Sequence, residues 1–435
     1  MERFLKTLRQ RLGPLGWGAL VVFAITRLAD GLYFLTKIVL GRWLSDVDFG
    51  AVEPVLSIRT FAMLPIVVLS EAMSKSISRF QERGELARKN KMIADLVRVT
   101  VIGSLLSVVV VYLFKPLILS RLALPMFPYI WIMAAIVAFG LWEPVCLAII
   151  RGERAYRLLN VPHVISPLIG FLLTVLLVGY LTTGLAGALT ARALAWLAVG
   201  VMTLLLIKGK LRGEKESYAD EYKVIKKTIV PMAILVTSMT LLVHFDRLFV
   251  RNFLTADSGG YGAIVTLGYI PSLLIGPIAF VILPLASAEH AASRNLNRLY
   301  RQSLALGLAI TACCTIGYVL FGHWALSLWN PRFSPYSGLL GLYGLVMGID
   351  GIVLTLAYIE TACHRYRYLW FLVVPTVAMC AALYAHRYSI SLVGVVVIIA
   401  AARLLVLVGM LAHIAMARSR RLSEESGDAT SAAHA

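Results

Sequence analysis

Long apolar segments alternate with short charged segments along almost the whole chain. A helix of about 20 predominantly apolar residues is long enough to cross a bilayer. Twelve segments meet this criterion: residues 17–40, 52–73, 96–119, 125–150, 158–180, 184–207, 228–253, 260–285, 302–325, 336–359, 368–386 and 390–416. The pattern therefore predicts an all-α integral membrane protein with about twelve transmembrane helices.

The Lys and Arg residues are distributed unevenly between the two ends of these segments. With the N-terminus on the inner side, the inner ends and loops contain 28 of these residues and the outer loops contain six. Positively charged loops are enriched on the cytoplasmic side of membrane proteins. The sequence therefore predicts cytoplasmic N- and C-termini, with only short loops on the outer side.

The longest and most charged inner loop lies near the middle of the chain and is expected to join two six-helix lobes, a common plan among transporters. A shift of 212 residues supports this division, because it aligns residues 49–52 (FGAV) with residues 261–264 (YGAI). The expected parts are an N-terminal lobe at 1–207, a cytoplasmic linker at 208–227, a C-terminal lobe at 228–416 and a disordered cytoplasmic tail at 417–435.

The composition agrees with a membrane protein and excludes other classes. Of the 435 residues, 59% are hydrophobic and 15% are charged, whereas soluble domains are roughly half apolar and a quarter charged. The net charge of +18 does not indicate nucleic acid binding, because the Lys and Arg residues lie between apolar segments. The five cysteines lie in or beside apolar segments, so neither a disulfide framework nor a metal site is predicted, and no cofactor is expected.

Charged residues interrupt the first two apolar segments: Arg27, Asp30, Lys37 and Arg59. Each charge at the centre of a membrane helix costs roughly 2.5–3.5 kcal/mol, whereas each Leu, Ile, Phe or Val contributes only about 0.3–0.6 kcal/mol in favour of insertion. The first segment would therefore insert poorly alone. This conflict predicts that its charges face a watery cavity or one another.

Helical geometry places Arg27, Asp30 and Lys37 on one face of the first segment. Arg59 has no acidic residue within one turn. Two interpretations follow for this set. In one, the residues bind an anionic substrate in a cavity; in the other, Arg27 and Asp30 only neutralise each other and Lys37 extends to the outer interface.

The second half contains intramembrane charges of its own. Asp246 and Arg247 are adjacent, so their side chains cannot face each other and each needs a partner on another helix. Arg247 is a candidate for substrate binding, and Asp246 and Asp350 are candidates for coupling transport to protons or sodium ions. Further candidates are Glu143, Arg192, Glu360 and Arg403, of which the two glutamates are expected at the cytoplasmic rim.

No catalytic motif is found in the sequence. It contains no glycine-rich phosphate loop, nucleophile elbow, zinc-ligand spacing or calcium-binding loop. We therefore expect a transporter and not an enzyme, driven by an ion gradient, by the gradient of its substrate or by a partner.

Two stretches resemble the polysaccharide-transporter branch of the MOP exporter superfamily, the Wzx-type flippases for lipid-linked oligosaccharides. They are ITRLADGLYFLTKIVLGRWLSDVDFGAV and HFDRLFVRNFLTADSGGYGAIVTLGYIPSLLIGPIAFVILPLAS. In that family the seventh span often contains Asp-Arg, followed by Gly-Tyr, Gly-Pro and Leu-Pro. The matching residues here are Asp246-Arg247, Gly260-Tyr261, Gly276-Pro277 and Leu283-Pro284.

The resemblance implies a two-lobed, MATE-like fold with a cationic central cavity, in the inner membrane of a bacterium. It implies an undecaprenyl-pyrophosphate-linked glycan as substrate, moved between leaflets by alternating access, with membrane lipid, H⁺ or Na⁺, and polysaccharide polymerase or assembly proteins as candidate partners. Arg27 and Arg59 match arginines that the related lipid II flippases place against the pyrophosphate. This chain departs from those flippases, because it has no arginine between Tyr261 and Leu285 and lacks their two extra helices.

A cation-coupled multidrug or small-molecule antiporter of the same superfamily is the alternative. Such an antiporter needs carboxylates in its cavity, whereas buried arginines predominate here. A membrane-bound polysaccharide polymerase would need a long outer loop with catalytic residues, and a major-facilitator sugar transporter would need a charged Gly/Asp/Arg loop after its second span. The sequence contains neither loop.

Overall fold

The computed structural model describes residues 25–153, 155–214, 216–276, 278, 282, 286, 296–363 and 365–433. Helices make up nearly all of this part of the chain, and it contains no strand. Long apolar runs form helices because a helix satisfies its own backbone hydrogen bonds where no water is present. The predicted all-α class is confirmed.

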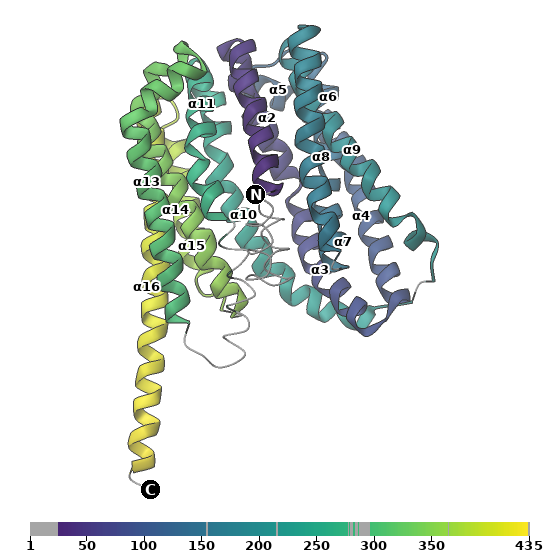
Figure 1. Cartoon of the computed structure of the whole chain (residues 1–435), viewed down its shortest axis with the longest axis vertical. Coiled ribbons are helices and arrows are strands. Elements are labelled where there is room, and N and C mark those ends of the chain that lie inside the picture. The colour runs from purple at the N-terminus through teal and green to yellow at the C-terminus, as the bar shows by residue number, and fades with distance from the viewer. Residues whose placement is uncertain are drawn as a thin grey trace, which may run out of the picture. The chain divides into compact units, whose positions relative to one another are not determined.

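The helices of the first half follow one another with short connections (Figure 1). After the helical residues 25–43 they are α2 (Asp46–Ala62), α3 (Leu64–Arg83), α4 (Leu86–Leu113), α5 (Lys115–Arg121), α6 (Tyr129–Gly140), α7 (Trp142–Gly152), α8 (Tyr156–Thr174) and α9 (Gly184–Arg212). A π-helical turn, Val175–Tyr180, ends α8. Helix α6 packs against α4 and α9, and α3 packs against α7.

The second half is also helical (Figure 1). Its helices are α10 (Tyr222–Phe253), α11 (Ser258–Gly268), α13 (Asn297–Trp329), α14 (Ser337–Ala362), α15 (Leu369–Ala385) and α16 (Leu392–Ala433), with short 3-10 turns at Ala219–Glu221, Thr255–Asp257 and Pro331–Tyr336. Helix α14 packs against α13 and α16, and α15 packs against α16.

Within the described residues, each predicted span coincides largely with helical residues. Nine helices of the described chain are long and apolar enough to cross a membrane, or ten if the bent pair α2 and α3 is one span. The first and eighth predicted spans, 17–40 and 260–285, extend outside the described residues, and α15 has only 17 residues. The chain is therefore a multi-pass membrane protein. Its described residues contain nine to ten spans, whereas the sequence predicts twelve.

The chain forms two compact units. Unit 1 comprises Met1–Thr237 with Thr255–Gly262, and unit 2 comprises Ser238–Leu254 with Ala263–Ala435. The linker predicted at 208–227 belongs to unit 1, and the boundaries between the units fall inside α10 and α11.

The second predicted span is bent by 51° between α2 and α3. The break falls at Met63, just before Pro65 in the first turn of α3. Proline lacks the N–H that would continue the hydrogen bonds of α2, and it disfavours a helical conformation of the preceding residue. The sequence predicted one continuous span here because the apolar run itself is unbroken.

The first of the two repeated FGAV-like stretches meets the start of the second, up to Gly262, inside unit 1. A Cβ atom at Gly50 of α2 would lie 2.2 Å from Oγ of Ser258, and one at Gly262 of α11 would lie 3.3 Å from the ring of Phe49. The absence of side chains at these glycines lets α2 and the start of α11 approach closely. The aligned positions therefore form one packing contact.

A row of glycines on α14 packs against α13 within unit 2. Cβ atoms built at Gly344 and Gly348 would lie 2.5 Å from Tyr318 and 2.3 Å from Thr311. Small residues at this spacing let helices pack closely in membranes. The glycine-rich stretch of the predicted tenth span is accordingly a packing face.

The C-terminal residues are more regular than expected. The sequence predicts a disordered tail at 417–435, whereas the backbone of α16 continues to Ala433. Residues 417–433 contain no proline, and extending an existing helix adds one hydrogen bond for each residue that is fixed. Continuation of α16 therefore needs no separate nucleation.

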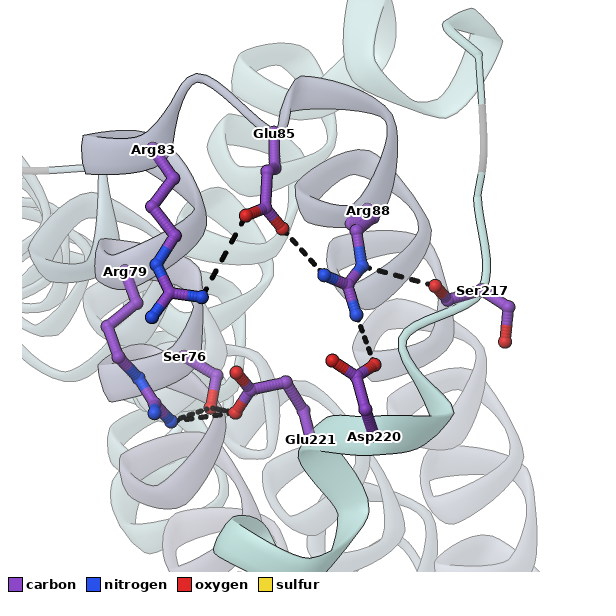
Figure 2. Close-up of polar contacts among 8 residues, drawn as sticks. All are labelled: Ser76, Arg79, Arg83, Glu85, Arg88, Ser217, Asp220 and Glu221. Atoms are coloured by element: carbon purple, nitrogen blue, oxygen red, sulfur yellow. Dashed lines mark hydrogen bonds and ion pairs between the residues drawn. The ribbon is translucent and has the colours of Figure 1, made fainter.

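The linker is bound to α3 and α4 by ion pairs (Figure 2). Arg88 of α4 donates to the carbonyl oxygen of Ser217 at 3.2 Å and pairs with Asp220, and Arg79 of α3 pairs with Glu221 at 2.7 Å. The hydrogen bond from Arg88 holds the pKa of Asp220 below its ordinary value. These contacts explain why the linker belongs to unit 1.

The turn between α3 and α4 positions this arginine. Gly84 ends α3 with a positive φ of 72°, a conformation that glycine adopts without steric cost. The turn places Glu85 between Arg83, at 3.8 Å, and Arg88, at 2.7 Å, as Figure 2 shows. The sequence at this turn therefore creates the surface that binds the linker.

Candidate functional site

Five side chains of unit 1 form a cluster of cations and aromatic rings, which we call the cation–aromatic cluster. Its members are Tyr33, Lys37, Arg59, Arg192 and Trp196. They come from the helix at residues 25–43, from α2 and from α9. Tyr33 and Lys37 are one helical turn apart, as are Arg192 and Trp196, so each pair shares a helix face.

Arg59 is held from three sides. Its Nη2 donates to the carbonyl oxygen of Gly140 at 3.0 Å and pairs with the carboxylate of Glu143, and its guanidinium carbon lies 3.9 Å from the centroid of the Trp196 ring. The residue is only 8% exposed. The sequence showed no acid within one turn of Arg59, and the structure supplies one from α7.

Gly140 makes this position of Arg59 possible. A Cβ atom at residue 140 would lie 2.2 Å from Nε of Arg59 and within 3 Å of its aliphatic carbons. Such distances are far below van der Waals contact, so any larger residue would displace the arginine. Glycine at the end of α6 is therefore part of the site.

Lys37 is also buried and paired. It is 2% exposed, forms an ion pair with Glu53 of α2, and lies 5.3 Å above the Tyr33 ring. The expectation that Lys37 extends to the interface does not describe this arrangement. Its burial is possible because the carboxylate and the ring together replace part of its hydration.

Arg192 differs from the other cations of the cluster. It is 7% exposed, and its guanidinium carbon lies 4.5 Å from the centroid of Tyr33 and 5.8 Å from that of Trp196. Among the described residues, no carboxylate pairs with Arg192 and no hydrogen bond to its guanidinium occurs. A buried arginine thus contacts two aromatic rings without a negative partner.

Arg27 and Asp30 form an ion pair at 2.9 Å, one turn apart on the helix at residues 25–43. Their side chains are 26% and 33% exposed, more than those of the cluster. The pairing agrees with the interpretation in which the two charges neutralise each other. The remaining exposure leaves Arg27 accessible to a ligand as well.

The charged residues of unit 2 form a different arrangement, which we call the acid–arginine network. It comprises Asp246, Arg247, Tyr343, Asp350 and Arg403. Nε of Arg403 pairs with Asp350 at 2.7 Å, and these side chains are 0% and 3% exposed. Arg403 also donates to the carbonyl oxygen of Leu242. This pair is fully enclosed within unit 2.

Asp246 has a partner on another helix, as predicted, whereas the Arg247 side chain contacts His244 on its own helix, α10. The fully buried Asp246 accepts hydrogen bonds from the Tyr343 hydroxyl at 3.1 Å and from the Arg247 backbone at 2.8 Å. The Arg247 side chain donates to Nδ1 of His244 at 3.4 Å. Asp246, Arg247 and Asp350 therefore all lie in unit 2. The site residues predicted in the first two spans lie in unit 1.

Sequence analysis did not identify Tyr33, Glu53 or Trp196 as site residues. A signal was available for the two aromatics, because each lies four residues from a cation inside an apolar segment. Glu53 pairs with a lysine on another helix, and no local pattern indicates such a pairing. Three His, Cys, Asp or Glu side chains placed to hold a metal ion do not occur in the described part of the chain.

The chain matches a known protein family. A family model described as polysaccharide biosynthesis protein matches residues 15–290. A search of curated proteins finds no match. The matched residues include every member of the cation–aromatic cluster.

Several solved structures share the fold. An inward-facing multidrug resistance MATE family transporter of the MOP superfamily has a TM-score of 0.72 at 15% identity, covering 92% of this chain and 99% of its own. The lipid II flippase MurJ, in an inward closed conformation, has a TM-score of 0.72 at 14% identity, covering 91% and 87%. A MOP superfamily transporter from Pyrococcus furiosus gives 0.64 at 15%, covering 91% and 94%. The MOP transporter fold expected from the sequence is confirmed.

Proposed function

We propose that this chain, which belongs to the polysaccharide biosynthesis protein family, is a flippase for an undecaprenyl-pyrophosphate-linked oligosaccharide. The substrate would be the repeat unit of an O-antigen, capsule or exopolysaccharide, moved from the inner to the outer leaflet by alternating access. Family membership and the MOP fold support a flippase-type membrane transporter. The nature of the substrate is argued from the charges.

The observation that supports an anionic substrate is the cation–aromatic cluster. A diphosphate with at least two negative charges is very costly to move through an apolar medium unless cations lie along its path. Arginine suits this role, because it is permanently charged and its forked donors fit phosphate oxygens. Unit 1 contains two buried arginines and one buried lysine within one cluster.

We assign substrate contact to the cations at the first two helices. Arg59 and Lys37 lie in the cluster, and Arg27 lies on the same helix as Lys37 with Asp30 as its partner. Asp30 would tune Arg27 by competing with the phosphate for its guanidinium. Arg247 is assigned a secondary contact from unit 2.

The carboxylates of unit 1 argue against the cation antiporter. Asp30, Glu53 and Glu143 are each ion-paired to a basic side chain. A cationic drug would have to displace one of these partners before it could bind a carboxylate. An anion would meet the same competition at Arg27, Lys37 and Arg59, but not at Arg192, with which no carboxylate of the described residues pairs.

We assign coupling to protons or sodium ions to Asp246 and Asp350. Both are buried acids held by specific partners, so uptake of a proton or ion would change the contacts of Tyr343 and Arg403. Transport that is unchanged after both gradients are collapsed would remove this assignment. The flippase activity itself does not depend on it.

The decisive experiment is a flipping assay with the purified full-length chain in proteoliposomes. A fluorescent undecaprenyl-pyrophosphate oligosaccharide should become accessible to an impermeant quencher only when the protein is present. Arg59→Ala should slow flipping about tenfold, because a hydrogen bond to a charged group contributes roughly 1.5–3 kcal/mol. Arg98→Ala, at an exposed arginine of α4 in the same unit, is the control. Absence of flipping by the unmodified chain, with export of a multidrug probe instead, would favour the antiporter.

A further inference from the structure

We propose that Arg192 is the main anion-binding residue of unit 1 and holds the diphosphate of the lipid-linked substrate. This inference rests on the proposed function, and it changes which residue matters most. The resemblance to known flippases indicates Arg27 and Arg59, which lie on the first two spans. Arg192 lies on α9, and its role is inferred from its surroundings in unit 1.

The first argument is the absence of a negative partner. Arg27, Lys37 and Arg59 each have a carboxylate, from Asp30, Glu53 and Glu143 in turn. Within the described ranges Arg192 has none, although it is 7% exposed. A buried charge without a partner is destabilising. A bound anion would supply the missing counter-charge.

The second argument is the geometry of the guanidinium group. Tyr33 lies 4.5 Å from its central carbon and Trp196 lies 5.8 Å away, and both contacts are with ring faces. An aromatic face attracts a guanidinium group through its charge and need not accept its N–H groups as a carboxylate does. The rings can therefore support Arg192 and leave donors for a phosphate.

The third argument is the residue that α8 places beside the group. Gly170 of α8 has no side chain, and a Cβ atom there would be in van der Waals contact with Nη1 of Arg192, at 3.4 Å. At this position α8 therefore directs no side chain at the guanidinium group. By contrast, Gly140 is in such close contact with Arg59 that a Cβ atom would overlap it.

The fourth argument is the difference in cost between the two arginines. Arg59 must release the carboxylate of Glu143 before it can bind a phosphate fully. Among the described residues, Arg192 has no ion pair to break. Both guanidinium groups lie against Trp196, so a diphosphate bound first at Arg192 can then compete with Glu143 for Arg59. The diphosphate should therefore bind Arg192 before Arg59, because Arg59 is paired with Glu143.

A purely structural role for Arg192 makes a different prediction. If the residue only packs between Tyr33 and Trp196, its replacement would lower stability equally with and without an anion. If it is an anion site, replacement by a neutral residue removes an uncompensated charge. The stabilisation given by a diphosphate would then be lost, while the ligand-free protein would unfold at the same temperature or higher.

The test measures thermal unfolding of the detergent-solubilised full-length chain with increasing inorganic pyrophosphate at constant ionic strength. The unmodified chain and Arg98→Gln should be stabilised with the same half-saturating concentration. Arg192→Gln should raise that concentration at least tenfold, and Arg192→Lys, which keeps the charge without the fork, should raise it a fewfold. An unchanged value in Arg192→Gln, or in Arg192→Lys if the glutamine variant does not fold, overturns the proposal.

Further measurements identify which phosphate-containing lipid the site binds. Undecaprenyl pyrophosphate should reproduce the Arg192-dependent stabilisation, whereas phosphatidylglycerol at equal concentration should not. Stabilisation by phosphatidylglycerol that is equally sensitive to Arg192→Gln would show a general anionic-lipid site and contradict the assignment. Lack of flipping in proteoliposomes together with Arg192-dependent pyrophosphate binding would reject the proposed function and keep the site. Flipping that is unaffected by Arg192→Gln would keep the function and reject the site.

Discussion

The charged clusters of the two units differ in how their cations are balanced. In unit 1, Arg59 and Arg192 lie against aromatic rings, and Arg192 lacks a carboxylate partner in the described part of the chain. In unit 2, Arg403 and Asp350 form an enclosed ion pair at 2.7 Å. In the second arrangement the buried guanidinium group already has a carboxylate, although Oδ1 of Asp350 and Nη1 of Arg403 make no hydrogen bond to the described residues. In the first, no carboxylate of the described residues balances Arg192, and a bound anion would supply the counter-charge.

The numbers of basic and acidic residues in each cluster show the same difference. The basic residues of the first two spans and α9 are Arg27, Lys37, Arg59 and Arg192, and their acidic neighbours are Asp30, Glu53 and Glu143. Four cations thus face three acids. The acid–arginine network has two of each. We infer that the Arg403–Asp350 pair stabilises unit 2, whereas the excess cation of unit 1 serves to bind a substrate.

The largest effect should follow from opening the network of unit 2. Asp350→Ala leaves Arg403 buried without its carboxylate, and such a loss costs about 3–5 kcal/mol. We expect a large drop in the unfolding free energy of the detergent-solubilised protein, with or without pyrophosphate.

The matched control removes both charges. Asp350→Leu combined with Arg403→Met should recover most of the lost stability, because apolar residues often replace a buried ion pair without loss. A double variant that is as unstable as Asp350→Ala would show that the two residues are not a closed pair. The proposed difference between the two units would then be wrong for unit 2.

A smaller effect is expected from the glycine beside Arg59. Gly140→Ala forces the arginine away from Glu143 and the Gly140 carbonyl, since the new Cβ would overlap its side chain. Overpacking of this kind costs about 1–3 kcal/mol, and transport should fall together with stability. Gly209→Ala in α9 is the control, because no atom lies within 4 Å of a Cβ there. Equal behaviour of the two variants in unfolding and flipping assays would contradict the role of Gly140.

Much of this fold could be predicted from hydrophobic periodicity, because each long apolar run forms a helix whatever its partners are. The ion pairs within the site could not be predicted in this way. Arg59 has no acid within one turn, and its partner Glu143 lies 84 positions away in the sequence. The contact depends on how α2 packs against α6, where Gly140 leaves room for the arginine side chain, and this effect is visible only when the helices are assembled.

The role of the aromatic rings can be tested at Tyr33. Tyr33→Leu removes the ring that supports Arg192 at 4.5 Å and Lys37 at 5.3 Å, and a cation–π contact contributes about 0.5–2 kcal/mol. Stability should fall by this amount, and the half-saturating pyrophosphate concentration should rise severalfold. Tyr33→Phe keeps the ring and should match the unmodified protein in both measurements. A loss as large in Tyr33→Phe as in Tyr33→Leu would assign the effect to the hydroxyl group.

The smallest effect on stability is expected at Asp30, and it offers the most direct contrast with Asp350. Asp30→Asn breaks an ion pair that is 26% and 33% exposed, and such pairs contribute about 0–1 kcal/mol. Its removal also takes away the carboxylate proposed to compete with an anion for the guanidinium group of Arg27, so pyrophosphate should bind more tightly although the protein is no more stable. The same kind of change, loss of one carboxylate, should thus nearly unfold unit 2 and strengthen anion binding in unit 1. Weaker pyrophosphate binding in Asp30→Asn would mean that Asp30 positions Arg27 for the anion and does not compete with it.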